Sequence, residues 1–233
     1  MTTGTDPGGN VYLTGFSYTG KSIVGGLLAT RLGHMYIDTD EQIERRTGRS
    51  IPEIFRTEGE VYFREIETEL LKELADQKGR VVSTGGGIVL DPLNRQLMAQ
   101  AGIIVCLEAK AETILERLRQ AADNESERPL LQLPNPLDEI RFLKGRRQRH
   151  YSEADVTVHT DALDVDGVVE SIVVQLRGTD RSHRPPSEDF ESDVAYKVET
   201  EIASYSIVVG TGVLHSIGHQ VRGLGFSGTA HIL

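Results

Sequence analysis

Hydrophobic residues in the first 177 positions form short apolar runs that alternate with longer amphipathic segments. Short runs rich in valine and isoleucine, bounded by glycine or acidic residues, are typical of buried strands. Five runs of this kind predict strands at residues 10–15, 34–40, 80–87, 103–108 and 155–160.

The segments between these runs show the apolar spacing of helices. After the first predicted strand, Val24, Leu28 and Leu32 recur every four residues and Gly33 follows, which predicts a helix over residues 21–33. The same pattern predicts helices at residues 41–77 (with breaks near 47–52 and 57–60), 91–102, 110–120, 137–151 and 161–177.

Strands that alternate with helices indicate an α/β fold, with a parallel sheet covered by helices on both faces. In such sheets, ligands bind beyond the carboxyl ends of the strands. Gly15, Asp38, Asp40 and the glycines at 85–87 all lie at the ends of predicted strands. We therefore expect these residues to share one site.

The sequence changes character after Arg177. Residues 178–193 contain two prolines, five acidic residues and almost no apolar ones, which is typical of a linker. Residues 194–233 resume with two strand-like runs, a glycine turn, a helix at about 213–224 and the start of another strand. The pattern predicts a domain at 1–177, a linker, and a short C-terminal β/α fragment.

Charge and cysteine content limit the partners. The net charge of −10 argues against non-specific binding to nucleic acid or to an anionic membrane, so an anionic substrate needs a local basic pocket. The single cysteine, Cys106, excludes an internal disulfide and fits a reducing compartment. Because the N-terminus lacks a basic, apolar signal sequence, we expect a cytoplasmic protein.

The stretch GFSYTGKS, from Gly15 to Ser22, has the spacing of a phosphate-binding loop. Glycines let backbone N–H groups face a phosphate, and the next helix presents its positive N-terminus. Lys21 would reach the β- and γ-phosphates, and the Ser22 hydroxyl would ligate Mg²⁺. The alternative is an ordinary tight turn between a strand and a helix.

Asp38 and Asp40 stand two residues apart at the end of the second predicted strand, so both are expected on the same side. One would hold Mg²⁺ through water, and the other would bind or deprotonate an acceptor hydroxyl. In the alternative interpretation, one is a helix cap and the other a solvated neighbour.

Several arginines are further candidates for the site, although arginines in such segments are normally solvated. Arg64 is on a predicted helix, and three more arginines follow in GRRQRHY. Arg128 lies in the polar segment 121–136, which is predicted to be a mobile loop and would suit closure over a γ-phosphate. The TGGG at 84–87 predicts either a turn or a close approach of ligand to backbone.

Together, GFSYTGKS, YIDTDEQIERRTGRSIPEIFRTEGEVYFREIE, VVSTGGGIVL and RPLL resemble the shikimate kinases, relatives of the nucleoside monophosphate kinases. The resemblance covers about residues 10–177. It implies a five-stranded parallel sheet, ATP and Mg²⁺ as cofactors, and phosphorylation of the 3-hydroxyl of shikimate.

The resemblance also assigns roles by position. Lys21, Asp40 and Arg128 would be catalytic, with Asp40 as the base and Arg128 as the lid arginine; Arg64 and Arg147 would clamp the substrate carboxylate, and Gly86 would offer its N–H. Ser22 and Asp38 would hold the metal. The nucleotide would lie against Arg128 and against Ser17, Tyr18, Thr19, Gly20, Lys21, Ser22 and Ile23.

Three positions depart from the family pattern. Tyr18 stands where a small residue, often glycine, is usual, and it would be strained if the position needs positive φ. Ile23 replaces the usual serine or threonine. RQRHY differs from R-x-P-L-Y, so the role of Arg147 rests on its distance from Tyr151.

The last 40 residues or so resemble the opening of 3-dehydroquinate synthase. The metal ligands and most of the dinucleotide site of such an enzyme would lie beyond Leu233, so we expect an incomplete fragment that contacts another chain or the missing synthase portion. Two rival functions remain for the main domain. One is phosphorylation of another hydroxy acid such as gluconate, and the other is an inactive binding module.

Overall fold

The computed structural model describes residues 9–121, 133–179, 194–199 and 204–209. The chain divides into two compact units, Met1–His183 and Arg184–Leu233. Arg128, most of the predicted linker and the predicted helix near 213–224 lie outside the described residues. No helix in the described ranges is long and apolar enough to cross a membrane.

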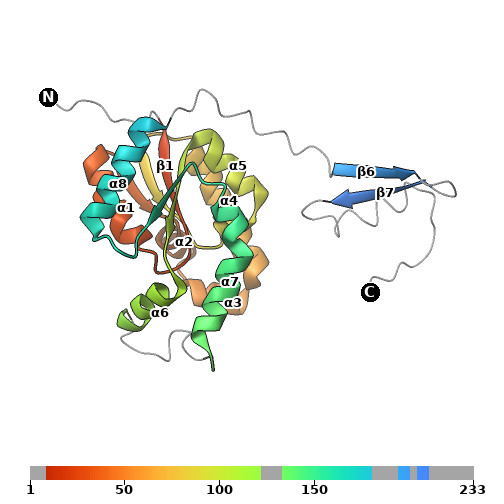
Figure 1. Ribbon diagram of the computed structural model, residues 1–233, viewed down its shortest axis with the longest axis horizontal. Helices are drawn as coiled ribbons and strands as arrows, with labels where there is room; N and C mark the ends of the chain where they lie inside the picture. The colour runs from red at the N-terminus through yellow and green to blue at the C-terminus, as the bar shows by residue number, and fades with distance from the viewer. Residues whose placement is uncertain (1–8, 122–132, 180–193, 200–203, 210–233) are drawn as a thin grey trace. The chain divides into compact units, whose positions relative to one another are not determined.

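The first unit contains the predicted five-stranded parallel sheet, in the order β2-β3-β1-β4-β5 (Figure 1). Its strands are β1 (Asn10–Thr14), β2 (Met35–Asp38), β3 (Arg80–Ser83), β4 (Gly102–Glu108) and β5 (Val156–His159). Its helices are α1 (Lys21–Leu32), α2 (Thr39–Thr47), α3 (Ile51–Thr57), α4 (Gly59–Ala75), α5 (Pro92–Ala101), α6 (Ala111–Gln120), α7 (Pro136–Tyr151) and α8 (Val165–Gly178), with a 3₁₀ turn η1 (Ile88–Leu90).

Each face of the sheet buries its own hydrophobic cluster. Along β1, Val11 and Leu13 belong to one cluster with α1 and α8, whereas Tyr12 between them belongs to the cluster with α4, α5, α6 and α7. Figure 1 shows α1 and α8 on one side of the sheet and α4 and α5 on the other. Successive side chains of a strand alternate between faces, so a strand buried on both faces is apolar throughout.

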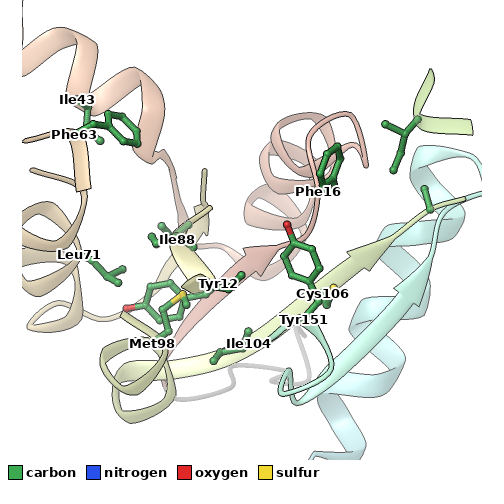
Figure 2. Packing of buried hydrophobic residues seen from close by; sticks show 14 of the residues in the cluster. Tyr12, Phe16, Ile43, Phe63, Leu71, Ile88, Met98, Ile104, Cys106 and Tyr151 are labelled. Carbon is green, nitrogen blue, oxygen red and sulfur yellow. The ribbon is translucent and has the colours of Figure 1, made fainter. Parts of the chain in front are cut away.

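The second cluster extends from the sheet to α7 and to the loop after β1. Tyr12, Ile104 and Cys106 lie on the strands, and Tyr151 at the end of α7 packs in the same cluster as Phe16 (Figure 2). The strand register aligns the carboxyl ends of three neighbouring strands. Ser83 at the end of β3 pairs with Leu13 of β1 and with Asp38 of β2.

The predicted strand at 80–87 ends at Ser83, before the glycines. Two other predicted boundaries were wrong because a carboxylate caps the helix that follows. The predicted strand at 34–40 ends at Asp38, because the Asp38 carboxylate caps α2 and Asp40 is already helical. The predicted helix at 161–177 begins only at Val165, because Asp164 caps it by accepting from the amide of Gly167. The predicted breaks in the long helical segment 41–77 are confirmed, since α2, α3 and α4 are separate helices.

In the second unit, β6 (Val194–Glu199) and β7 (Ser204–Val209) form an antiparallel pair in which Val194 is opposite Val209. The two strand-like runs predicted after residue 193 are therefore strands.

Candidate active site

The loop between β1 and α1 is shaped by two glycines with positive φ. Gly15 has φ 127° and packs so closely on the carbonyl of Leu107 that no side chain fits. Gly20 has φ 98° and precedes α1, whose first amide groups have no partner within the helix. Inside the loop, Thr19 Oγ1 donates to the Phe16 carbonyl at 2.8 Å. The result is a helix N-terminus framed by a shaped loop, which suits an anion.

Tyr18 has the positive φ that would strain a residue with a side chain at this position. Its φ is 64°, and among the described residues it is alone in this respect apart from glycines. This conformation costs a residue with a side chain about 1–2 kcal/mol. The ring of Tyr18 packs against the cluster beneath it, and its carbonyl accepts from Arg117 at 3.4 Å. Arg117 also donates to the Thr160 hydroxyl at 2.9 Å, so the strained loop is tied to the segment after β5.

Lys21 is a buried cation at the centre of the loop. Its ammonium donates to the carbonyl oxygens of Gly15 and Phe16, each at 2.9 Å. Burial lowers the pKa of Lys21 to about 8, although Asp40 acts in the opposite direction. A cation held in a partly desolvated loop is poised to bind a phosphate, which would restore its full charge.

Ser22 and Asp38 are hydrogen-bonded to each other across the site. The Ser22 hydroxyl donates to Asp38 Oδ2 at 2.9 Å, and Tyr36 OH donates to the same oxygen at 3.2 Å. Asp38 Oδ1 accepts from the amides of Asp40 and Glu41. Two hard oxygen groups beside a phosphate loop fit Mg²⁺, which takes few protein ligands and completes its shell with phosphate and water. Ile23, the next residue along α1, offers no oxygen to a metal or phosphate, and it is 68% exposed.

Asp40 reaches the site from the first turn of α2 rather than from a strand. Asp38 and Asp40 are neighbours because one caps the helix that carries the other, so the strand spacing used to predict them gave the right pair for the wrong reason. Burial and the nearby Asp38 raise the pKa of Asp40. Its Oδ1 is buried and has no hydrogen-bond partner among the described residues. A carboxylate with raised basicity and an unused oxygen can accept a proton from a hydroxyl.

The three glycines after β3 each touch a different part of the site. A Cβ on Gly85 would stand 2.8 Å from Glu67 Oε1 and 3.0 Å from Asp40 Oδ1. A Cβ on Gly87 would stand 2.8 Å from the guanidinium carbon of Arg64. Close approach therefore explains Gly85 and Gly87, since a side chain at either position would displace the charged groups beside it, whereas a Cβ on Gly86 would meet only ordinary contacts.

Arg64 is held on α4 by two carboxylates. Its Nη1 donates to Glu67 Oε2 at 2.7 Å and its Nη2 donates to Glu60 Oε1 at 3.1 Å. Glu67 is fully buried, and burial raises its pKa to about 7 in spite of Arg64. The guanidinium also lies 5.2 Å from the centre of the Phe63 ring. Arg64 is thus oriented toward the glycine turn rather than solvated.

Arg147 approaches the same turn from α7. Its Nη1 donates to the Gly86 carbonyl at 3.3 Å, and its guanidinium lies 5.4 Å from the centre of the Phe16 ring. Arg64 and Arg147 therefore flank the Gly86–Gly87 peptide from two helices. Arg146 instead stacks over Phe142.

Sequence reasoning missed four residues that shape this site. Two of them had a readable signal: Glu67 follows Arg64 by three residues on a helix, and Tyr151 follows Arg147 by four, spacings at which helical side chains meet. Phe16 and Arg117 had none, because their contacts join segments far apart in the chain. The four residues are Phe16, Glu67, Arg117 and Tyr151.

Comparisons with known proteins find relatives over most of the chain. The family model described as shikimate kinase matches residues 18–177. The chain is 46% identical over 170 residues to a shikimate kinase of Geobacter sulfurreducens, covering 73% of this chain and 92% of the relative. It is 47% identical over 166 residues to one of Thermus thermophilus, covering 71% and 89% respectively. A solved shikimate kinase from Acinetobacter baumannii, in complex with shikimate, matches with a TM-score of 0.67 and 38% identity over 73% of this chain and 93% of that one.

Proposed function

The chain belongs to the shikimate kinase family, and we propose that it transfers the γ-phosphoryl group of ATP to the 3-hydroxyl of shikimate. One observation supports an acceptor that carries a carboxylate, and the family match favours shikimate over another hydroxy acid such as gluconate. The described site has two guanidinium groups, of Arg64 and Arg147, on either side of one glycine turn, and the turn also touches Asp40. An acceptor with a carboxylate at one end and a hydroxyl at the other would span this arrangement.

ATP and Mg²⁺ would bind at the loop between β1 and α1. The loop amides from Ser17 to Ser22 and the ammonium of Lys21 would hold the phosphates. Ser22 would ligate Mg²⁺ directly and Asp38 would hold it through water, since its carboxylate already caps α2. The metal, when bound, would neutralise charge on the transferring phosphoryl group.

The acceptor would bind against the glycine turn. Arg64 and Arg147 would grip its carboxylate with their planar donor forks, and the Gly86 N–H would donate to it from the turn. Asp40 would accept a hydrogen bond from the 3-hydroxyl and then take its proton as the oxygen attacks phosphorus. The new bond joins that oxygen to phosphorus, the bond to the bridging oxygen of ATP breaks, and ADP leaves with its electron pair.

Arg128 would complete the site from the loop between α6 and α7. Its part in the proposal rests on its sequence context, ERPLL, because it lies outside the described residues. An arginine on a segment that closes over the nucleotide would stabilise charge on the γ-phosphate.

Two experiments test the proposal: a comparison of acceptors, and a substitution of Arg64 that keeps its charge but changes the geometry of its donors. ADP release should be rapid with shikimate and near background with gluconate. Arg64→Lys keeps the charge but loses the fork, so the KM for shikimate should rise about tenfold or more. Arg45→Lys is the control, since Arg45 pairs with Glu41 on the exposed face of α2, and this variant should leave KM unchanged. Turnover of gluconate at the rate of shikimate would contradict the proposed acceptor.

For the remainder of the chain, we propose that residues 178–193 link the kinase domain at 1–177 to the beginning of a 3-dehydroquinate synthase-like unit at 194–233. The sequence YSIVVGTGVLHSIGHQVRGLGFSGTAHIL supports it, as does the antiparallel β6–β7 pair. Such a unit would contact another chain or further synthase residues. The buried, unpaired Cys106 supports a reducing compartment such as the cytoplasm.

A further inference from the structure

Two side chains of α7 donate to a single carbonyl oxygen in the glycine turn. Arg147 and Tyr151 are one helical turn apart and lie on the same face of α7. The Tyr151 hydroxyl donates to the Gly86 carbonyl at 2.7 Å, and Arg147 Nη1 donates to the same oxygen at 3.3 Å. One contact is short and the other is long, so Tyr151 is the stronger partner of this carbonyl.

The Gly86 carbonyl belongs to a peptide that both halves of the site use. A Cβ on Gly86 would stand 3.4 Å from the Gly15 carbonyl oxygen and from the Ser17 amide nitrogen, so Gly86 lies against the phosphate loop. The next residue, Gly87, lies against the guanidinium of Arg64. A rotation of the Gly86–Gly87 peptide would disturb both contacts.

Arg147 is held loosely in the absence of substrate. Its guanidinium rests over the Phe16 ring, makes the long bond to Gly86 described above and interacts with the Tyr151 hydroxyl, but it has no carboxylate partner among the described residues. A bidentate pair joins two opposite charges through two short hydrogen bonds, whereas the bond to Gly86 is single, long and made to a neutral carbonyl, so an acidic acceptor would draw Arg147 away from Gly86.

Tyr151 cannot follow it. Its side chain is only 1% exposed and packs in the hydrophobic cluster of β1 and β4, where burial raises its pKa and keeps the hydroxyl protonated as a donor. Figure 2 shows its hydroxyl at the end of the ring nearer Phe16. When Arg147 leaves, Tyr151 remains bonded to the Gly86 carbonyl.

We propose that Tyr151 is a positioning residue of the acceptor site: its hydroxyl holds the Gly86 carbonyl and thereby frees Arg147 to bind the acceptor carboxylate. Tyr151 touches no reacting atom in this scheme. The inference rests on the proposed role of Arg147 in binding shikimate. Without the hydroxyl, Arg147 would be the remaining described donor to Gly86, and each substrate molecule would have to break that bond and leave the carbonyl unpaired.

Tyr151→Phe removes one oxygen and keeps the ring, so the fold should be retained. In the full chain, the KM for shikimate should rise about tenfold, the cost of leaving one carbonyl unpaired. The KM for ATP and kcat should change by less than about twofold, since neither the phosphate loop nor Asp40 loses a contact.

Tyr12→Phe is the matched control. Tyr12 is also fully buried in the same cluster and its hydroxyl accepts from Asn10 at 3.2 Å, but Figure 2 shows that hydroxyl well away from Tyr151. Tyr12→Phe should lower the melting temperature comparably and leave the KM for shikimate unchanged. If Tyr12→Phe raises this KM as much as Tyr151→Phe, then the effect is a general loss of core stability and the inference is overturned.

A double-mutant cycle separates positioning from simple structural support. The shikimate dissociation constant would be measured calorimetrically for Arg147→Ala and for Arg147→Ala/Tyr151→Phe. Once Arg147 is absent, loss of the Tyr151 hydroxyl should change the constant by less than about twofold, because the two side chains are coupled through one acceptor. The same fold-change in both backgrounds would overturn the inference.

The proposed function and this inference fail in different ways. If the unaltered chain does not phosphorylate shikimate, both are overturned. If the unaltered chain is active and Tyr151→Phe has the same KM for shikimate, only the role of Tyr151 is overturned.

Discussion

At the scale of single residues, the site concentrates ionisable groups that burial alone would disfavour. Lys21, Asp40 and Glu67 all have pKa values shifted toward the neutral form, and in each case burial is the largest cause. Desolvation is unfavourable for folding but strengthens every electrostatic contact with a charged ligand. Buried charges at one edge of the sheet therefore mark where ligand binding compensates.

The rate of phosphoryl transfer should depend on the Lys21 ammonium. Lys21→Ala should lower kcat by about 10²–10³-fold or more, since it removes a charge placed against the developing negative charge. Lys72→Ala, which removes an exposed lysine from α4, should leave kcat unchanged. Circular dichroism checks that both variants fold. Near-normal turnover in Lys21→Ala would show that this lysine is not part of the catalytic loop.

Glu67 should give the folded protein a specific pH dependence. Because burial raises its pKa to about 7, Glu67 stays protonated in the folded chain at pH values where the unfolded chain has lost that proton. Its contribution to the free energy of unfolding is fully present below the ordinary pKa, near 4.5, and is lost as the pH rises through about 7. Between pH 5 and 8, the free energy of unfolding of the wild type should therefore fall by on the order of 2 kcal/mol relative to that of Glu67→Gln.

Urea unfolding at pH 5 and pH 8 measures this difference. Glu73→Gln is the control, because Glu73 is an exposed partner of Arg46 with a lowered pKa. The stability that Glu73 adds is lost only as the pH falls through and below the ordinary pKa of a glutamate. The difference in free energy of unfolding between Glu73→Gln and the wild type should therefore be constant between pH 5 and 8. A constant offset for Glu67→Gln as well would mean that Glu67 is ionised throughout.

At the scale of elements, the glycine turn after β3 acts as a spacer between α2, α4 and α7. Gly87→Ala should displace the Arg64 guanidinium, because the new methyl group would occupy its place, while the backbone at Gly87 has an ordinary φ of −100°. The fold should survive and the KM for shikimate should rise about tenfold or more, with the KM for ATP unchanged.

Gly26→Ala is the control for this substitution. No atom lies within 4 Å of a Cβ at Gly26, which is inside α1, so alanine there should raise stability by about 0.5–1 kcal/mol without affecting KM. If Gly87→Ala binds shikimate normally, then Arg64 is mobile enough to bind from another position.

The existence and order of the elements were predictable because each depends on local pattern. The apolar runs gave the sheet, and glycine spacing gave the phosphate loop. Element starts were less predictable: Asp38 and Asp164 are helix caps, and a capping carboxylate resembles the polar end of a strand in sequence. The pairing of Arg147 with Phe16 was not predictable, since it depends on how α7 packs across the sheet.

At the scale of the whole molecule, the site is a consequence of strand register in a sheet covered on both faces. Because Leu13, Ser83 and Asp38 are level in neighbouring strands, three loops leave the sheet at one edge. The helices on both faces then supply the functional groups, with Lys21 and Ser22 from α1 on one face and Arg64 from α4 on the other. The site residues described above all lie between Gly15 and Tyr151, within the first unit.

The kinase unit should therefore work without the C-terminal unit. A chain that stops after Thr179 keeps the end of α8, where the Thr179 hydroxyl donates to the Gln175 carbonyl at 2.9 Å. Activity with shikimate should stay within about twofold, because the buried residues of the described core end at Leu176. A stop after Asp164 is the opposite control. It removes α8 and its five buried side chains, and the shortened protein should not fold, as its melting curve would show. The buried residues lost are Val168, Val169, Ile172, Val173 and Leu176.

Limited proteolysis of the full chain tests the same boundary without a variant. The first cut should fall between Gly178 and Asp193, where two prolines and five acidic residues cannot bury a core, and the fragment released from the N-terminal side should keep its kinase activity. If instead the chain that stops after Thr179 loses shikimate phosphorylation, or the segment resists cleavage, then the C-terminal residues stabilise the kinase unit directly. The boundary at residue 177 would then divide a single folded unit.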